Sequence, residues 1–228
     1  RVTIVVRERS RYAHTRMKRI NPKLSMVELR ERHGLAAEAI HARLNEFKNI
    51  SPSDYFYELV YCLLTPQSSA VHAEKTVRAL REHDLQNSTI DPEPILSRKD
   101  SYIRFHRTKA RHLLAVKDQY KEIHPHLING SSGNEIREWL VENVKGLGWK
   151  EASHFLRNIG RDNLAILDRH ILRNLLKTGV LRALPKTLTT KHYLAIEKKF
   201  RSFAEKAGIP MDELDLLFWS METGDILK

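Results

Sequence analysis

The chain has 228 residues, of which 41% are hydrophobic, with 39 basic side chains against 28 acidic ones. This length suits one large domain or two small ones, and it allows a sizeable core. The sequence holds no run of about 18 apolar residues, and the apolar patch at residues 2–6 is shorter than the roughly 7–15 residues of a signal-peptide core. These features argue against a secreted or membrane-spanning protein and predict an intracellular one.

A single cysteine, Cys62, limits the chemistry that thiols can supply. One thiol cannot form an intramolecular disulfide, a structural zinc site or an iron–sulfur cluster, all of which need several ligands. The twelve histidines show no pairing typical of zinc sites, and no phosphate-binding glycine loop or HExxH motif is present. The sequence therefore predicts no metal and no organic cofactor.

The net charge of +11 is concentrated at one end of the chain. Residues 1–33 hold ten basic and three acidic side chains, a net +7, which leaves only +4 for the rest. We interpret residues 1–24 as a basic N-terminal arm. It either contacts phosphate or another anionic surface, or it is a solvated extension without a partner.

Apolar residues recur every three or four positions from Ser25 onward, which predicts amphipathic helices with a break near Gly34. A helix over 55–64 is apolar on most faces and is expected to be buried. The turn at 65–69 interrupts it, and further helices are expected from Ala70, after Asp91 and over 109–123. Alternation typical of a strand occurs only at 2–7. The sequence predicts an all-α protein.

The segment 135–160 predicts two helices joined by a tight turn. Helices are expected over 135–144 and 150–159, and Gly160 follows the second helix where a terminating glycine is common. Gly146 and Gly148 flank Leu147, so the chain can reverse tightly while Leu147 is buried between the helices. Backbone N–H groups at the start of the second helix would then be free to bind phosphate.

This helix-hairpin-helix pattern, Gly146-Leu147-Gly148-Trp149-Lys150, is followed eighteen residues after Lys150 by Asp168. The combination resembles the helix-hairpin-helix DNA glycosylases. The wording of residues 145–158, and a C-terminal segment 217–228 that ends on lysine, resemble the archaeal-type 8-oxoguanine DNA glycosylases within that superfamily. The resemblance implies a two-domain all-α fold with the active-site cleft between the domains.

The resemblance also implies a division of the chain. One domain is expected to be a helical barrel over residues 62–166 that contains the hairpin. The other is expected to combine residues 25–61 with 167–228, so that it is built from both ends of the chain. The implied partner is double-stranded DNA with an oxidised purine, bound by a monomer in the cytoplasm or nucleoid.

Lys150 is the candidate nucleophile. An ordinary lysine is almost fully protonated at pH 7, which blocks nucleophilic attack. A helix N-terminus, the neighbouring Lys145 and partial desolvation would all favour the neutral amine. A neutral amine could attack a sugar C1′ and form a Schiff base. The resemblance implies this role, with base displacement and then strand cleavage by β-elimination; otherwise Lys150 is a surface lysine that contacts phosphate.

Asp168 falls where a helix is expected to begin, so it is either an N-cap or a catalytic carboxylate, and both roles can coexist. A capping carboxylate is kept ionised by the helix dipole and can stabilise positive charge on a deoxyribose. The resemblance implies that Asp168 is the catalytic aspartate. For the DNA backbone, it implies contacts from Lys145 and from the Gly146, Leu147 and Gly148 turn.

Base removal from a duplex requires a wedge and a pocket. Gln67, in Leu64-Thr65-Pro66-Gln67-Ser68, resembles the amide wedge of the superfamily, although it could simply begin a helix. Trp219, Lys228 with its terminal carboxylate, and Phe105 are the candidate pocket residues, although aromatic residues of an all-α protein are usually core.

Two stretches are rich in basic residues. Residues 104–121 hold six basic side chains and one acidic, and residues 136–182 hold nine against five. Either stretch could form a DNA-facing rim or the solvated faces of amphipathic helices. Two other functions remain open at this level: a non-catalytic DNA-binding module, or a glycosylase for a different oxidised base.

Overall fold

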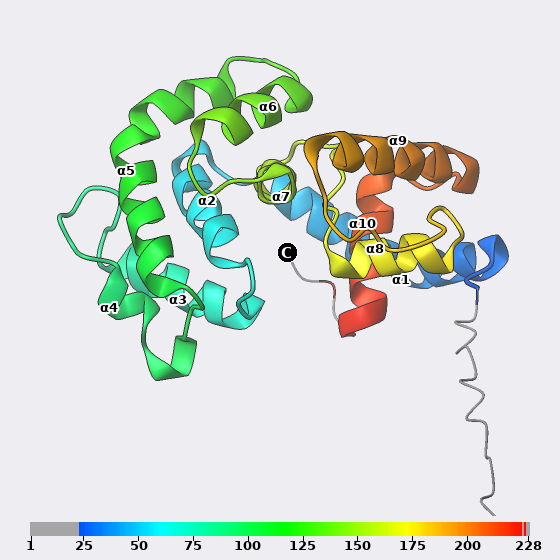
Figure 1. The fold of residues 1–228 in the computed structure, drawn as a ribbon, viewed down its shortest axis with the longest axis horizontal. Helices are drawn as coiled ribbons and strands as arrows, with labels where there is room; N and C mark the ends of the chain where they lie inside the picture. The colour runs from blue at the N-terminus through cyan, green and yellow to red at the C-terminus, as the bar shows by residue number, and fades with distance from the viewer. Residues whose placement is uncertain (1–22, 225, 227–228) are drawn as a thin grey trace, which may run out of the picture.

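The computed structural model describes residues 23–224 and 226, and over that part of the chain it contains helices and no strand. The α-helices, labelled as in Figure 1, are α1 (Met26–Lys48), α2 (Tyr55–Leu64), α3 (Ala70–Glu82), α4 (Glu93–Leu96), α5 (His106–Ile128), α6 (Gly133–Asn143), α7 (Trp149–Asn158), α8 (Arg169–Lys177), α9 (Thr190–Ala207) and α10 (Met211–Thr223). Short 3-10 turns lie at Pro52–Asp54 and Lys99–Ser101.

The predicted all-α class is confirmed. The strand expected at 2–7, and all of the arm except residues 23 and 24, lie outside the described residues. No helix in the described part of the chain is long and apolar enough to cross a membrane.

Helix α1 is continuous through Gly34, so the break predicted there is wrong. Ser25 caps the helix by accepting a hydrogen bond from the Glu28 N–H. A glycine inside a helix is unfavourable by only about 1 kcal/mol relative to alanine. Burial of Leu29, Ile40 and Phe47 along the helix outweighs that penalty.

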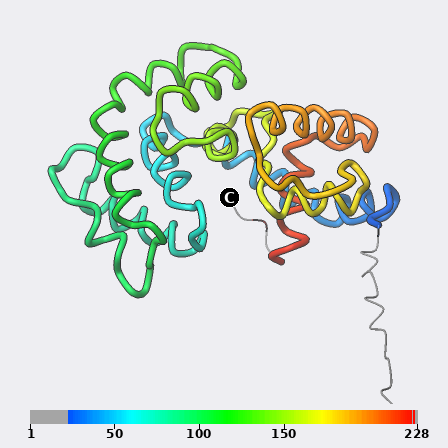
Figure 2. Tube along the Cα trace, viewed as in Figure 1, coloured from blue at the N-terminus to red at the C-terminus, as the bar shows by residue number. Residues whose placement is uncertain are grey.

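The buried apolar side chains form two clusters. The first runs in sequence from Phe56 to Leu164 and is built by α2 to α7. The second combines residues 29–47 of α1 with residues from 165 to 218, in α8, α9 and α10. Figure 1 shows the two groups of helices side by side with α7 between them, and Figure 2 shows the chain crossing from one group to the other near residues 50 and 160.

The first cluster begins at Phe56 rather than at residue 62. Helix α2 is buried from Phe56 to Leu64, so its residues pack as one unit and the expected boundary at 61/62 would divide them. We therefore propose that the two clusters mark two domains, with the first crossing in the segment 49–54 and the second between Leu164 and Ala165.

Helix α7 is held from several sides by buried polar contacts. The Asn158 Nδ2 donates to Glu58 of α2 at 3.1 Å, and the Arg157 guanidinium pairs with Asp215 of α10 at 3.1 Å. Residues 152–158 of α7 are all buried. Because both groups of helices grip α7 along most of its length, only its first turn is partly exposed.

The C-terminus of α7 explains the glycine that follows it. Gly160 has a left-handed φ of 83°, and its N–H donates to the Arg157 carbonyl at 3.0 Å while the Arg161 N–H donates to the Leu156 carbonyl at 2.9 Å. These two bonds form a Schellman motif, so the predicted glycine terminator is confirmed. A Cβ at Gly160 would lie 2.9 Å from the Lys48 Cα, so glycine also allows α1 to approach α7 closely.

Candidate active site

The hairpin between α6 and α7 has the tight geometry that its glycines predict. Gly146 adopts a left-handed φ of 97°, whereas Gly148 is the extended N-cap of α7 with φ −96°. Leu147 is 5% exposed, and its N–H donates to the Val144 carbonyl at 3.2 Å. The reversal therefore buries Leu147 as expected and closes the turn with its amide.

The first turn of α7 keeps its backbone donors free. No side chain caps the helix, and no hydrogen bond within the described residues engages the N–H of Gly148, Trp149 or Lys150. His112 of α5 lies under the turn, since a Cβ at Gly146 would be 2.5 Å from the His112 Nδ1. Burial lowers the pKa of His112, and the positive charge of Lys145 lowers it further. Free N–H groups beside positive charge form a surface suited to an anion.

Lys150 lies in this first turn, and its side chain is 24% exposed. Its Nζ is 3.8 Å from the Glu151 Oε1, an ion-pair distance that is too long for a hydrogen bond. The Lys150 amine therefore lies beside the hairpin turn, and no described residue occupies it with a strong hydrogen bond, as a nucleophile requires.

Asp168 is the N-cap of α8, as its position predicts. Its Oδ1 accepts from the N–H groups of His170 and Ile171, both at 2.8 Å. No hydrogen bond to a described residue engages Oδ2, and the side chain is half-buried. One oxygen thus fixes the carboxylate to the helix, and the other is available to a ligand.

The segment before Asp168 is anchored by buried hydrogen bonds. The Tyr193 hydroxyl donates to the Ala165 carbonyl at 2.5 Å and accepts from the Leu167 N–H at 3.3 Å. The Glu197 carboxylate accepts from the Ala165 N–H at 2.8 Å. Tyr193 and Glu197 both belong to α9, so this helix sets the position from which Asp168 emerges.

The charges of Lys150 and Asp168 both influence the pKa of one buried carboxyl group, that of Asp215. Burial raises the pKa of Asp215 to about 7, with Arg157 opposing the rise. The charge of Asp168 raises this pKa further and that of Lys150 lowers it. The two predicted catalytic groups therefore lie within electrostatic range of one point in the molecule, where α7 and α8 approach α10.

Among the predicted pocket residues, Trp219 lies on the same side as Asp168. Its ring contacts the imidazole of His170 edge to face, with 6.3 Å between ring centroids, and it is partly exposed. His170 is the second residue after Asp168, so α10 places the Trp219 indole beside the first turn of α8. Lys228, the other predicted contact at the chain end, lies outside the described residues.

Gln67 and Phe105 are exposed residues of two neighbouring loops. Both adopt left-handed backbone conformations, with φ of 55° and 60°, which are uncommon for residues other than glycine. Gln67 lies in the turn after α2, and Phe105 directly precedes α5 with its side chain 51% exposed. Phe105 is therefore not a core aromatic residue, and Gln67 does not begin a helix, since α3 starts at Ala70.

Lys109 is a site residue that the sequence reasoning missed. Its Nζ donates to the carbonyl oxygens of Leu64 and Pro66, at 2.6 and 2.7 Å, and burial lowers its pKa to about 8. The charge of Glu151 raises this pKa, and that of Lys150 lowers it. Lys109 lies one turn before Leu113 on the buried face of α5. The sequence could have indicated its burial, because Lys109 has the same helical spacing as the apolar residues of this face.

The burial of Lys109 argues against its being the nucleophile. It is 6% exposed, and a third hydrogen bond, to the Ser68 Oγ at 3.1 Å, uses the last of its donors. Arg137 and Arg157 are also buried, in ion pairs with Glu197 and Asp215. These cations belong to the two basic stretches, so those stretches are not wholly DNA-facing rims.

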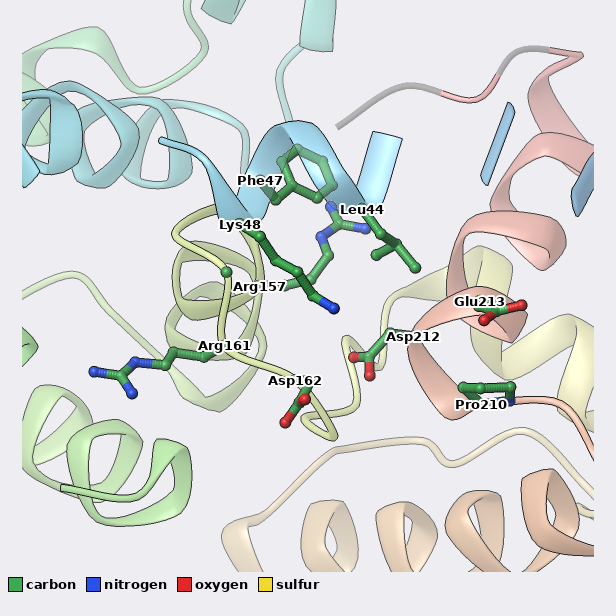
Figure 3. A pocket seen from close by; sticks show the side chains of 10 residues that line it. Leu44, Phe47, Lys48, Arg157, Arg161, Asp162, Pro210, Asp212 and Glu213 are labelled. Carbon is green, nitrogen blue, oxygen red and sulfur yellow. The ribbon is translucent and has the colours of Figure 1, made fainter. Parts of the chain in front are cut away.

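A pocket of about 230 Å³ beside the C-terminal end of α7 is not lined by the predicted catalytic residues (Figure 3). It is lined mainly by the C-terminal end of α1, the segment 160–162 and the start of α10. Lys48 and Asp212 point into it from opposite sides. Among the described residues there is no cluster of histidine, cysteine or acidic side chains that could hold a metal ion.

The fold and hairpin define a helix-hairpin-helix protein, and comparison with known proteins gives the family. The family model described as 8-oxoguanine DNA glycosylase matches residues 40–209. An 8-oxoguanine DNA glycosylase/AP lyase of Fusobacterium nucleatum is 45% identical over 197 residues, which cover 82% of this chain and 89% of the relative. The corresponding protein of Methanocaldococcus jannaschii is 37% identical, over 84% of this chain and 92% of the relative.

Solved structures agree with this result. The 8-oxoguanine glycosylase/lyase of Methanocaldococcus jannaschii, in complex with a 15-mer DNA that contains 8-oxoguanine, superimposes with a TM-score of 0.79 at 34% identity, over 89% of this chain and all of that one. The 8-oxoguanine DNA glycosylase of Thermotoga maritima gives a TM-score of 0.79 at 30% identity, over 89% and 98%. The chain therefore belongs to the 8-oxoguanine DNA glycosylase family, which confirms the resemblance seen in its sequence.

Proposed function

We propose that this protein removes 8-oxoguanine from duplex DNA and then cleaves the strand at the resulting abasic site. Its family and the DNA-bound relative support the substrate class. The observation that carries the proposal is the environment of Lys150. The Lys150 amine is partly exposed, makes no strong hydrogen bond to a described residue, and lies in the first turn of an otherwise buried helix, beside free backbone donors.

In the proposed reaction the lone pair of the neutral Lys150 amine attacks C1′ of the damaged nucleoside. The bond from C1′ to the base breaks, and the base leaves with the electron pair and takes up a proton. The sugar ring then opens to a Schiff base on Lys150. Loss of a C2′ proton and β-elimination break the C3′–O bond and cut the strand, and water releases Lys150.

Asp168 would stabilise the positive charge that develops on the sugar as the base departs. Its Oδ1 is held by two backbone N–H groups, which fixes its position without using Oδ2. We propose that Oδ2 faces the sugar. The carboxylate thus combines both roles left open by the sequence, the cap and the catalytic charge.

The remaining site residues fit an extruded base. We propose that Gln67 fills the gap left in the stack, that Phe105 and Trp219 form flat faces of the pocket, and that Lys228 contacts the base edge. Lys145 and the turn of Gly146, Leu147 and Gly148 would hold the DNA backbone. The cleft between the proposed domains would receive the nucleotide, and we expect a monomer to suffice.

Borohydride reduction of the Schiff base tests the proposal directly. The wild type should form a covalent complex with a duplex that contains 8-oxoguanine, because borohydride fixes the transient lysine adduct. Lys150→Gln should form none. Lys145→Gln is the matched control in the same hairpin: it should weaken binding, yet still be trapped when the enzyme is in excess.

Three results would contradict the proposal in different ways. Trapping of Lys150→Gln at the wild-type level would mean that another amine is the nucleophile. Salt-sensitive binding that is the same with and without the lesion, with no base release, would indicate a DNA-binding module. Release of another oxidised base, but not 8-oxoguanine, would be consistent with the proposed lysine mechanism but would show that the proposed substrate is wrong.

A further inference from the structure

The Lys109 ammonium connects two loops that carry proposed substrate-contacting residues. It donates to the Leu64 and Pro66 carbonyls and to the Ser68 Oγ, all in the turn that contains Gln67. An ammonium has three N–H groups, and each has an acceptor here. The turn is thus closed around a single buried cation.

Ser68 extends this connection to the second loop. Its Oγ also accepts from the Arg104 N–H at 3.1 Å, and Phe105 is the next residue. The Phe105 carbonyl in turn accepts from the backbone N–H of Lys109 at 3.0 Å. Lys109 and Ser68 therefore fix the Gln67 turn and the Phe105 loop relative to one another.

Both loops hold a residue in a strained conformation. A left-handed backbone at a residue other than glycine is unfavourable and persists only where surrounding contacts enforce it. Gln67 and Phe105 both adopt it, and both side chains are exposed, so their own packing does not explain the conformation. The hydrogen bonds of Lys109 and Ser68 hold Pro66 and Ser68, on either side of Gln67, and Arg104, which precedes Phe105.

We propose that Lys109 is a positioning residue for base extrusion, which holds Gln67 and Phe105 together in the conformations that engage the gap in the stack and the extruded base. This inference rests on the function proposed above and assigns a role to a buried lysine outside the predicted catalytic pair. Burying a charge is unfavourable, and an apolar residue at this position of α5 would serve packing alone. The three acceptors explain why the cation is present.

The test separates base extrusion from the chemistry at Lys150 by comparing two substrates. A duplex with 8-oxoguanine requires extrusion, a pocket and chemistry, whereas a duplex with a preformed abasic site offers no base to extrude. Single-turnover rates with enzyme in excess make differences in affinity irrelevant. Lys109→Met keeps the aliphatic stem and removes the ammonium.

We expect Lys109→Met to slow base release by about 100-fold, since a shift of about 1 Å in a positioning group can have that effect. Cleavage of the abasic duplex should stay near the wild-type rate. Ser68→Ala removes the link that runs through the Ser68 Oγ but leaves both carbonyl bonds of Lys109, so it should slow base release by a smaller factor. It also keeps the inference testable if Lys109→Met does not fold.

Lys117→Met is the matched control. Lys117 lies on the same helix, and its Nζ donates to the Ser88 carbonyl, in a loop without a proposed site residue. Both of its rates should equal those of the wild type. Equal loss on both substrates in Lys109→Met and Ser68→Ala would overturn the inference, as would wild-type base release in both. If the wild type itself releases no 8-oxoguanine, the proposed function fails and this inference fails with it.

Discussion

Asp168 shows how one side chain can satisfy two demands at the residue scale. An aspartate at a helix start is usually a cap, and the two bonds to Oδ1 show that it caps α8 here. Because both bonds use the same oxygen, the cap and a catalytic charge do not compete. The structural and functional roles can therefore be separated by a substitution that keeps the oxygen and removes the charge.

Asp168→Asn is expected to make that separation. Asparagine caps helices as well as aspartate does, so the free energy of unfolding should change by less than about 1 kcal/mol. Base release should fall by about 100-fold or more, because a neutral amide cannot stabilise the positive sugar. Thermal melting and single-turnover assays measure the two effects. A matching loss of stability would show that Asp168 acts through the fold.

The two glycines of the hairpin differ in whether their backbone conformation requires glycine: Gly146 is left-handed, and Gly148 is extended. We expect Gly146→Ala to destabilise the protein by at least about 1–2 kcal/mol because of its left-handed φ. The new Cβ would also lie 2.5 Å from the His112 Nδ1, so that ring would have to move. Gly148→Ala is the comparison, since its φ of −96° suits alanine and its Cβ would meet only the tip of Glu151, at 3.1 Å. Chemical denaturation should show a larger loss for Gly146→Ala; equal losses would contradict this account.

Helix α1 illustrates, at the scale of an element, how tertiary packing overrides a local signal. Glycine is an unfavourable residue for a helix interior, yet α1 runs through Gly34 without a break. The position is exposed, and a Cβ there would meet nothing within 4 Å. The glycine therefore makes no contact that requires it, and its flexibility only disfavours the helix.

Gly34→Ala should consequently stabilise the protein by about 0.5–1 kcal/mol, because alanine reduces the backbone entropy lost on folding. Base release should not change, since Gly34 is not among the site residues. The midpoint of urea denaturation, with an unchanged slope, measures the gain. A loss of stability would mean that α1 needs a distortion at this position.

Helix α7 is the element on which the site depends. Its buried side chains bind α2 through Asn158 and α10 through Arg157, while the hairpin leaves its first turn partly exposed. A rigid helix with one accessible turn holds Lys150 in place without a flexible loop, which suits its proposed role as the nucleophile. Helix α5 has the corresponding role on the other side of the site, where Lys109 holds the loops of Gln67 and Phe105.

At the scale of the whole molecule, buried ion pairs join the two clusters. Arg137 of α6 binds the two carboxylate oxygens of Glu197 of α9 with its two terminal guanidinium nitrogens, at 2.7 and 2.9 Å. Glu197 also accepts from the Ala165 N–H, in the segment that leads to Asp168. The same carboxylate thus links α6, α9 and the segment that precedes Asp168.

Arg137→Met should destabilise the protein by about 3–5 kcal/mol, because Glu197 would remain buried without its counter-charge. Replacing Glu197 by methionine as well should restore only part of this loss, since the Ala165 N–H would lose its acceptor. Denaturation of the single and double variants measures both quantities. A single variant as stable as the wild type would show that the pair does not hold the two halves together.

The sequence by itself determined the family and the helical class, and it supplied Lys150 and Asp168 as the catalytic candidates. Helix periodicity is local, the hairpin motif lies in consecutive residues, and Asp168 follows only eighteen residues after Lys150. The same is true of Gly160, whose role as a helix terminator depends only on the four residues before it and the one after it.

Only the tertiary structure decided which charged residues face solvent and which are buried. The sequence does not distinguish Lys109, Arg137 and Arg157 from nearby surface cations. The acceptors of Lys109 are 41–45 residues away along the chain, and the carboxylates that pair with Arg137 and Arg157 are 60 and 58 residues away. The unbroken course of α1 and the membership of α2 in the first cluster likewise depend on distant partners. Burial is a property of which segments meet, and a charge is kept inside only where folding brings its acceptors to it.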